Sequence, residues 1–380
     1  MLPFTGIDFF ILAALLFGLL LVFKSVLKNV VPFRTALLTV TLIYIVLYFP
    51  KPLQAGLFVA WCYGVYYLLE YVIQSKRKLP GVILLLLPMV LIKANVPMSF
   101  ISFAGLSYVT FRVLQIYLDN DPVNRPVRID DFILFMLFPA TILIGPIDRF
   151  QRFSGDLKNG YVQLSGERIQ DGFEKIMLGI LQKFVVAELI NRYALSHLDA
   201  ESKSLTVMLQ NMYVYAFYLY FDFAGYSSLA CGLARMLGID VPENFKNPFV
   251  AVNPKDFWRR WHITLSEWLT DYLFRPYYKW ISGKKSMKNY PLMKQNIGLF
   301  LVFLVMGLWN GFHWHFLLSG IVFGIYSVVH NTYVFQCKKR GKDIVFGSLS
   351  AFTVKYVSIF LMFNFACIAL YIFSGRCPLV

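Results

Sequence analysis

The sequence predicts an all-α, polytopic membrane protein. The prediction rests on the low content of charged residues, the high mean hydropathy and the recurrence of long apolar runs. Of the 380 residues, 58% are hydrophobic and only 15% are charged, whereas soluble domains carry about 25% charged residues. Mean hydropathy is +0.60. Apolar runs recur along the whole chain at roughly the 17–25 residues that an α-helix needs to cross lipid. A transmembrane β-barrel would instead show alternating segments of about 10 residues.

Eleven apolar runs are candidate membrane spans, in order 8–23, 34–49, 55–74, 80–94, 98–118, 132–146, 173–191, 207–236, 296–309, 315–335 and 347–373. The runs 80–94 and 132–146 are short for a bilayer, so we expect them to be buried, tilted or re-entrant. The first run has no basic segment before it and no small-residue cleavage site after it, which predicts a retained helix. No charge-rich linker or repeat divides the chain, so we expect residues 1–380 to form a single membrane domain.

The basic residues lie between the apolar runs. The chain has 36 Lys and Arg against 21 Asp and Glu, a formal charge of +15. The positive-inside rule and attraction to anionic membrane lipids explain this excess, so no nucleic-acid partner is expected. Basic loops at 24–34, 76–78 and 338–342 all fall on the cytoplasmic side if the amino terminus is extracellular.

Segment 256–280 has a different pattern. Aromatic and apolar residues recur at three- and four-residue steps at Trp258, Trp261, Leu265, Trp268 and Tyr272. Charged residues fall on the other faces. This pattern favours one interfacial or half-inserted amphipathic helix, and the simpler interpretation is a membrane-surface helix held by its tryptophans.

Charged residues inside or beside apolar runs are default candidates for a site. Asp148 and Arg149 follow a Gly-Pro pair that ends or kinks the preceding run. Asp222 lies in an aromatic run among small residues, where a partner such as Arg149 or Arg260 is expected. The simpler interpretations are a charge pair at the membrane boundary and a structural ion pair.

Three of the five histidines are candidates for proton transfer. His313 and His315 lie in MGLWNGFHWHF (306–316), and His262 ends RRWH (259–262). An imidazole can accept a proton from a hydroxyl and later donate it. Asn310 and His313 are three residues apart, so a continuous helix would place them on nearby faces. Satisfied core histidines remain the alternative interpretation.

Other chemistries have little support. The five cysteines are scattered without paired spacing, which predicts neither a disulfide framework nor a metal site. The two histidines of 306–316 have no matching Cys or carboxylate spacing for zinc. A Gly-rich phosphate loop, a GxSxG elbow and an HExxH motif are all absent from the sequence.

Six segments together resemble the membrane-bound O-acyltransferase (MBOAT) superfamily. They are LSYVTFR, FMLFPATILIGPIDRF, FDFAGYS, PENFKNPF, DFWRRWHITLSEWL and GLWNG, and their order and spacing match over residues 100–335. FDFAGYS and RWH also occur in the polysaccharide O-acetyltransferases of the superfamily. LSYVTFR together with GPIDRF favours the D-alanyl transferase branch.

The resemblance implies about eleven spans and re-entrant or interfacial helices around a central tunnel. In that branch the donor is D-alanine held as a thioester on the phosphopantetheine of a D-alanyl carrier protein. The acceptor is a hydroxyl of teichoic acid or a related cell-envelope polymer, and a membrane-attached accessory protein of the Dlt pathway assists. No cofactor bound to the chain itself and no metal is implied. The implied location is the bacterial plasma membrane.

The resemblance also implies which residues form the site. His262 matches one functional histidine of the family. The implied substrate or tunnel residues are Asp148, Arg149, Asp222, Tyr226, Arg260, Trp261 and Trp309.

The chain departs from the family at two positions. The usual motif is Trp-His-Gly with a catalytic histidine, whereas this chain has Trp309-Asn310-Gly311. A second family histidine aligns with Phe323. An amide does not shuttle protons near neutral pH, although it can hydrogen-bond an acyl oxygen.

Three hypotheses follow from Asn310. The chain is an inactive or repurposed homologue, it uses His313 or His262 as the base, or the asparagine was introduced to trap an inactive state. The rival functions are a polysaccharide or peptidoglycan O-acetyltransferase and a non-catalytic scaffold or transporter. Transport folds often show internal repeats, which the sequence lacks.

Overall fold

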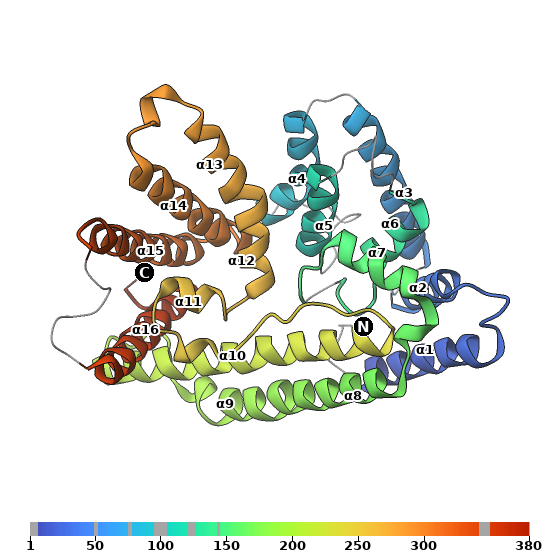
Figure 1. Ribbon diagram of the computed structural model, residues 1–380. Coiled ribbons are helices and arrows are strands. Elements are labelled where there is room, and N and C mark those ends of the chain that lie inside the picture. Colours follow the sequence, from blue (N-terminus) through green and yellow to red (C-terminus); the bar gives the residue numbers. More distant parts are fainter. Residues whose placement is uncertain are drawn as a thin grey trace. The chain divides into compact units, whose positions relative to one another are not determined.

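The computed structural model describes residues 7–48, 52–74, 78–94, 105–119, 127–142, 145–341 and 350–379 (Figure 1). In these ranges the chain is α-helical and contains no β-strand, so the all-α prediction is confirmed. The chain forms two compact units. The first unit comprises Met1–Leu181 and Gly225–Glu243, and the second comprises Gln182–Ala224 and Asn244–Val380.

The first unit contains eight helices among the described residues before the chain leaves it. They are α1 (Ile7–Val26), α2 (Phe33–Tyr48), α3 (Pro52–Gln74), α4 (Lys78–Lys93), α5 (Leu106–Asp119), α6 (Ile129–Leu137), α7 (Phe150–Asn159) and α8 (Gly166–Ile180). Helix α6 is only 9 residues long and is buried from Asp131 to its end, where it packs against α2 and α3. The described residues of the run 132–146 are buried, which agrees with the first of the three alternatives expected for it (buried, tilted or re-entrant); residues 143–144 lie outside the described residues.

Helix α10 (Leu205–Met236) begins in the second unit and ends in the first. Its carboxyl-terminal part packs closely on α8 because both helices carry glycines at the contact. A Cβ on Gly232 would lie 2.5 Å from the main-chain oxygen of Gly172, and one on Gly179 would lie 2.8 Å from that of Gly225. No side chain fits there without moving a backbone, as expected of small residues in an apolar helix pair.

The remaining helices of the second unit follow in order. They are a π-helical turn at Leu181–Ala187, α9 (Glu188–Tyr193), α11 (Pro254–Trp258), α12 (Ile263–Leu269), a π-helical turn at Thr270–Phe274, α13 (Arg275–Ser282), α14 (Pro291–Asn310), α15 (Trp314–Lys339) and α16 (Ala351–Phe373). Helices α14 and α15 form an antiparallel pair, seen side by side in Figure 1. A Cβ on Gly307 or on Gly320 would lie 2.6 Å from a main-chain oxygen of the other helix.

Four described helices are long and apolar enough to cross a membrane: Asp8–Val26, Pro291–Asn310, Trp314–Lys339 and Ala351–Phe373. Shorter apolar helices cover Phe33–Leu47, Ala55–Leu69 and Pro80–Lys93. The chain is thus a helical membrane protein, but the expected eleven spans are not confirmed. Some residues of the predicted apolar runs, 98–104, 143–144 and 347–349, lie outside the described residues. The same holds for the basic positions 76, 77 and 342, on which the predicted orientation depends.

The prediction of one amphipathic helix over 256–280 is wrong. The segment divides into α11, α12, a π-helical turn and α13. The break between α11 and α12 lies at His262, whose φ of 44° and ψ of 52° are left-handed. A left-handed residue cannot continue a right-handed helix. Side-chain periodicity gives no sign of this break. The residues directly after it, Ile263 and Thr264, are hydrogen-bonded to Asn244, which lies outside the segment.

Candidate functional site

A cavity of about 180 Å³ lies inside the second unit, bounded by α10, α11, α12, α14, α15 and α16. Most of its wall is aromatic or aliphatic. The lining residues are Leu219, Phe223, Trp258, Trp261, Leu265, Phe303, Met306, Gly307, Asn310, Phe316, Ser319, Gly320, Phe323, Leu370 and Phe373. The aromatic stripe of segment 256–280 therefore forms a cavity wall in part, through Trp258, Trp261 and Leu265.

Asn310 contributes polar atoms to this wall. It is the last residue of α14, and its Nδ2 donates a hydrogen bond to the main-chain oxygen of Met306 at 2.8 Å. Ser319 also lines the cavity, but its hydroxyl donates to the main-chain oxygen of Ala369 at 2.9 Å. Two of the polar groups in the wall are thus engaged with main-chain carbonyls.

Phe323 stands where the resemblance places a second family histidine, and it belongs to an aromatic cluster. Its ring centroid lies 4.9 Å from that of Trp258, 5.9 Å from that of Phe257 and 6.3 Å from that of Phe303. Phe323 is 4% exposed. The departure from the family at this position is accommodated by packing, and it makes the wall less polar.

His262 lies beside the cavity and is almost fully buried, at 4% exposed. Its ring meets the edge of Phe223 at 4.8 Å and lies 6.1 Å from Trp309 of α14, measured between ring centroids. Its Nδ1 lies 3.4 Å from Oδ1 of Asn244. Its Nε2 is buried with no hydrogen-bond partner among the described residues.

Burial lowers the pKa of His262 well below its ordinary value, because an apolar surrounding disfavours the charged imidazolium. The ring is therefore neutral at physiological pH. A neutral imidazole donates through one nitrogen and accepts through the other. With Nδ1 facing an oxygen, Nε2 carries the lone pair and is the accepting atom.

The indole of Trp258 adds a donor to the same wall. Its Nε1 is buried and makes no hydrogen bond among the described residues. A buried N–H without a partner is costly, so each such group calls for an explanation. His262 is not itself a lining residue, but its ring contacts Phe223, which lines the cavity, as Trp258 does. A buried acceptor and a buried donor around one cavity are groups that a reaction with proton transfer and developing negative charge can use.

The structure separates His313 from this site. Helix α14 ends at Asn310 and α15 begins at Trp314, so the continuous helix assumed for Asn310 and His313 is wrong. His313 is exposed at the start of α15 and does not line the cavity. His315 lies near the end of α16, with Nδ1 2.8 Å from the main-chain oxygen of Phe373.

The partners expected for Asp222 are also wrong. Asp222 forms an ion pair with Lys183 of the π-helical turn at Leu181–Ala187. Arg260 instead pairs with Asp256, one helical turn earlier, at 2.9 Å. The reason is geometric: the π-helical turn brings a lysine from outside any predicted motif to the carboxylate.

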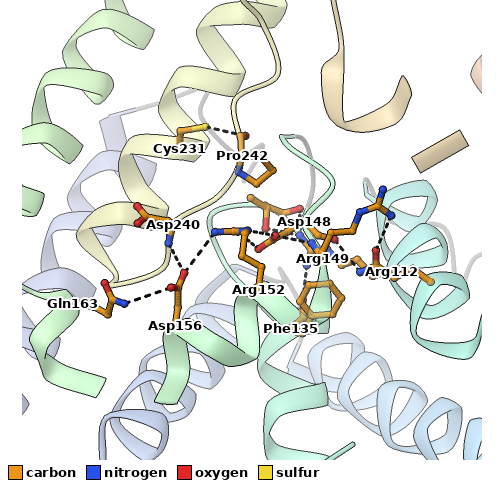
Figure 2. Close-up of polar contacts among 12 residues, drawn as sticks. Arg112, Phe135, Asp148, Arg149, Arg152, Asp156, Gln163, Cys231, Asp240 and Pro242 are labelled. Atoms are coloured by element: carbon orange, nitrogen blue, oxygen red, sulfur yellow. Dashed lines mark hydrogen bonds and ion pairs between the residues drawn. The ribbon is translucent and has the colours of Figure 1, made fainter. Parts of the chain in front are cut away.

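Asp148 and Arg149 lie in the first unit, in a polar network that Figure 2 shows. Arg152 lies between two carboxylates, pairing with Asp148 and, at 3.6 Å, with Asp156. The main-chain nitrogen of Arg149 donates to Asp148 at 2.6 Å. Burial raises the pKa of Asp148, and the charge of Arg152 opposes that rise.

Arg112, from LSYVTFR, anchors another part of this network. It is 1% exposed, and its guanidinium donates to the main-chain oxygens of Phe135, Met136 and Thr141 and to the Thr141 hydroxyl. It thereby satisfies carbonyls at the end of α6. Residues of LSYVTFR and of GPIDRF thus belong to one buried polar network in the first unit. Tyr226 is half-buried in the part of α10 that belongs to this unit.

Sequence reasoning missed Asn244, which contacts His262, and Trp258 and Phe323 as cavity walls. Asn244 was within a recognised motif, PENFKNPF, but nothing in a single sequence says which residue of one motif faces another. Among the described residues, no group of three His, Cys, Asp or Glu side chains is placed to hold a metal ion.

Comparison with known proteins agrees with the motifs. The chain matches the model of the MBOAT, membrane-bound O-acyltransferase family, over residues 123–374. It is 36% identical over 285 residues to the teichoic acid D-alanyltransferase of Bacillus subtilis (strain 168), covering 74% of this chain and 70% of that protein. It is 35% identical over 309 residues to the one of Streptococcus thermophilus, covering 77% and 74%.

A relative with a different activity is also similar to this chain. The peptidoglycan O-acetyltransferase of Helicobacter pylori is 35% identical over 211 residues, covering 55% of this chain and 38% of that protein. The family match spans more than half of the chain and includes His262, Asn310 and the whole cavity wall. The helical membrane fold, the six motifs and these matches together place the chain in the membrane-bound O-acyltransferase family.

Proposed function

We propose that the protein transfers D-alanine from a carrier-protein thioester to a hydroxyl of teichoic acid or a related cell-envelope polymer. The observation that carries this proposal is His262, a buried imidazole whose ring contacts Phe223 of the cavity wall and whose Nε2 has no hydrogen-bond partner among the described residues. The named activity of the Bacillus and Streptococcus relatives supplies the substrate class.

In the proposed reaction, the acceptor hydroxyl donates its proton to Nε2 of His262 while its oxygen attacks the thioester carbonyl carbon. The carbonyl oxygen becomes an oxyanion, and Trp258 Nε1–H is the buried donor available to it. When the intermediate collapses, the C–S bond breaks. The leaving phosphopantetheine thiolate takes the proton from the imidazolium, and the ester of D-alanine remains on the acceptor.

The cavity's apolar wall serves this reaction by excluding water, which would otherwise hydrolyse the thioester. Phosphopantetheine reaches the site as the arm of the donor carrier protein, so the chain itself needs no bound cofactor. Asn310 has a supporting part: its Nδ2 is held by Met306, and an amide does not exchange protons near neutral pH. This favours His262 over position 310 and over the exposed His313 as the base.

The proposal places the chain in the bacterial plasma membrane with an extracellular amino terminus. About eleven spans and re-entrant helices would surround a tunnel that joins the cytoplasmic donor to the extracellular acceptor. The basic residues of 275–288 (Arg275, Lys279, Lys284, Lys285 and Lys288) are exposed and would steer an acidic carrier protein. A membrane-attached accessory protein of the Dlt pathway completes the assembly.

The test is a reconstituted transfer assay. Purified protein in vesicles receives carrier protein loaded with labelled D-alanine, together with teichoic acid. We expect label in the polymer with the unaltered chain and none above background with His262→Gln. Transfer that appears only after Asn310→His would instead show that the natural chain is inactive.

O-acetyl transfer is the second candidate, and one observation favours it. A D-alanyl group carries an ammonium, yet no carboxylate lies among the residues that line the cavity. Burying an unpaired charge is costly, whereas a neutral acetyl group has no such cost. Labelled acetate in the polymer, with no labelled D-alanine, would decide for this activity.

A further inference from the structure

One residue of PENFKNPF holds three consecutive residues of the next motif. Asn244 is fully buried, and its Oδ1 accepts hydrogen bonds from the main-chain nitrogen of Thr264 at 3.2 Å and from the Thr264 hydroxyl at 2.7 Å. Its main-chain oxygen accepts from the nitrogen of Ile263 at 3.0 Å. His262 Nδ1 lies 3.4 Å from the same Oδ1.

These contacts fix which atom of the amide faces the histidine. The main-chain nitrogen of Thr264 can only donate, so the Asn244 atom that it contacts is the oxygen and not the nitrogen. An amide oxygen only accepts. The ring nitrogen that faces it therefore carries the proton, which leaves the lone pair on Nε2.

The same contacts hold the unusual backbone of His262. A left-handed φ of 44° is unfavourable for a residue with a Cβ and persists where surrounding contacts over-determine it. The Asn244 contacts lie on the residues directly after His262, at the start of α12. Strained residues of this kind cluster where a side chain must be aimed.

We propose that Asn244 is the positioning residue of the acyl-transfer site, holding His262 in the tautomer with a protonated Nδ1 and an accepting Nε2. This inference rests on the proposed acyl transfer for its effect on rate. Its structural part, the tautomer and its dependence on Asn244, is independent of which acyl group is transferred. The choice of asparagine matters because a neutral acceptor orients the ring without stabilising the imidazolium as a carboxylate would.

The residues around His262 are Phe223 of α10, Trp309 of α14, Asn244 of the segment that precedes α11, and Thr264 of α12. None of these four carries a charge near neutral pH. Changing Asn244 to aspartate would thus introduce a single charge next to Nδ1, and its effect can be read without a competing titration among these neighbours.

The experiment uses the full chain in proteoliposomes with ¹⁵N-labelled histidine. Solid-state NMR reads the tautomer of each ring, and His262→Gln identifies the signal of His262 among the five histidines. We expect a protonated Nδ1 in the unaltered protein. Asn244→Leu removes the acceptor, so the preference is lost and kcat for acyl transfer falls by roughly 10–100-fold, as for other groups that orient a histidine.

Asn244→Asp is the conservative variant. It restores the acceptor and the tautomer, recovers part of the rate, and moves the acid limb of the pH–rate profile to higher pH because the carboxylate stabilises the imidazolium. Thr264→Val is the matched control, since it removes one hydrogen bond to Asn244 without touching the histidine contact. It is expected to keep the protonated Nδ1.

A protonated Nε2 in the unaltered protein would overturn the inference, as would an Asn244→Leu variant that keeps both the tautomer and the pH profile. Should Asn244→Leu fail to fold, Asn244→Asp decides: an unshifted acid limb contradicts the assignment. Absence of transfer by every variant, the unaltered chain included, would count against the proposed function alone, because the NMR signal still reports the tautomer.

Discussion

In the first unit, Asp148 and Arg112 meet an opposite charge or main-chain carbonyls, whereas in the second a buried ring nitrogen has no hydrogen-bond partner among the described residues. Asp148 pairs with Arg152, and Arg112 donates to the carbonyls at the end of α6. The ring of His262 instead contacts Phe223 of the cavity wall, and its Nε2 makes no hydrogen bond within the part of the chain that the structure describes. Both sets of residues come from family motifs, so motif membership alone does not separate them.

The two regions differ in whether the desolvation free energy of their buried polar groups is offset by contacts within the folded protein. A saturated network recovers that cost in the folded state and fixes the arrangement of helices. An unsatisfied polar atom next to a space recovers it only when a ligand or substrate arrives. Asp148 and Arg152 meet as an ion pair, so we expect the first unit's network to be structural, and we propose the cavity beside His262 as the chemical site.

The sharpest test of the comparison is His262→Gln. Removing a general base lowers a rate by about 10²–10⁴-fold, and we expect a loss in that range in the labelled-transfer assay. His313→Gln is the control, because that side chain is exposed, whereas His262 is buried against Phe223 of the cavity wall. The reverse ranking of the two variants would move the base to His313.

Asp148→Asn should act on stability instead. Removing one partner of a buried ion pair costs about 3–5 kcal/mol, so we expect a lower thermal-unfolding temperature in detergent and a lower folded yield. Transfer per folded molecule should be retained. Asp171→Asn is the matched control, since Asp171 is 51% exposed and such pairs contribute about 0–1 kcal/mol. Lost turnover in fully folded Asp148→Asn would make this network part of the site.

Trp258→Phe tests the donor in the cavity wall. The change keeps an aromatic ring and removes Nε1–H, and loss of one donor to an oxyanion typically lowers kcat by roughly 10²–10³-fold. KM should change less, because the contact strengthens only as negative charge develops. Trp268→Phe serves as the control, since Trp268 does not line the cavity. Equal kcat for the two variants would argue against Trp258 as the donor.

Stability should also depend on pH through His262. Burial lowers the pKa of His262 in the folded protein. Below about pH 6.5 the imidazole is protonated in the unfolded chain but stays neutral in the folded chain. The free energy of unfolding therefore decreases as the pH falls. Between pH 6.5 and 5 the expected loss is about 2 kcal/mol. Unfolding temperatures of the unaltered chain and of His262→Gln should therefore converge at acid pH. Parallel curves would show that the folded ring takes up the proton.

Asn310→Ala should have the smallest effect. It removes the hydrogen bond to Met306, worth about 0.5–1.5 kcal/mol, and we expect transfer to fall less than about tenfold, or 1.4 kcal/mol. A larger loss would give Asn310 a direct part in the reaction. A large gain with Asn310→His would show instead that this position has lost a catalytic residue.

The sequence by itself determined the membrane class, the helical fold and the family. Each depends on composition, on the length of apolar runs and on the order of motifs, and these are properties of the chain before it folds. It also identified His262 and Asn310 as candidates. Most predicted apolar runs correspond to helices because a chain in lipid must satisfy its backbone hydrogen bonds internally.

Only the tertiary structure decided which candidates lie together. It paired Lys183 with Asp222, placed Asp148 and Arg112 in a buried polar network, and broke the predicted helix at His262. The sequence could not show these outcomes, because each depends on contacts between residues far apart in the chain. Asn244 is 18 residues from His262, and this long-range contact lies at the left-handed break in the helical pattern, where we propose that it sets which nitrogen of the ring accepts a proton.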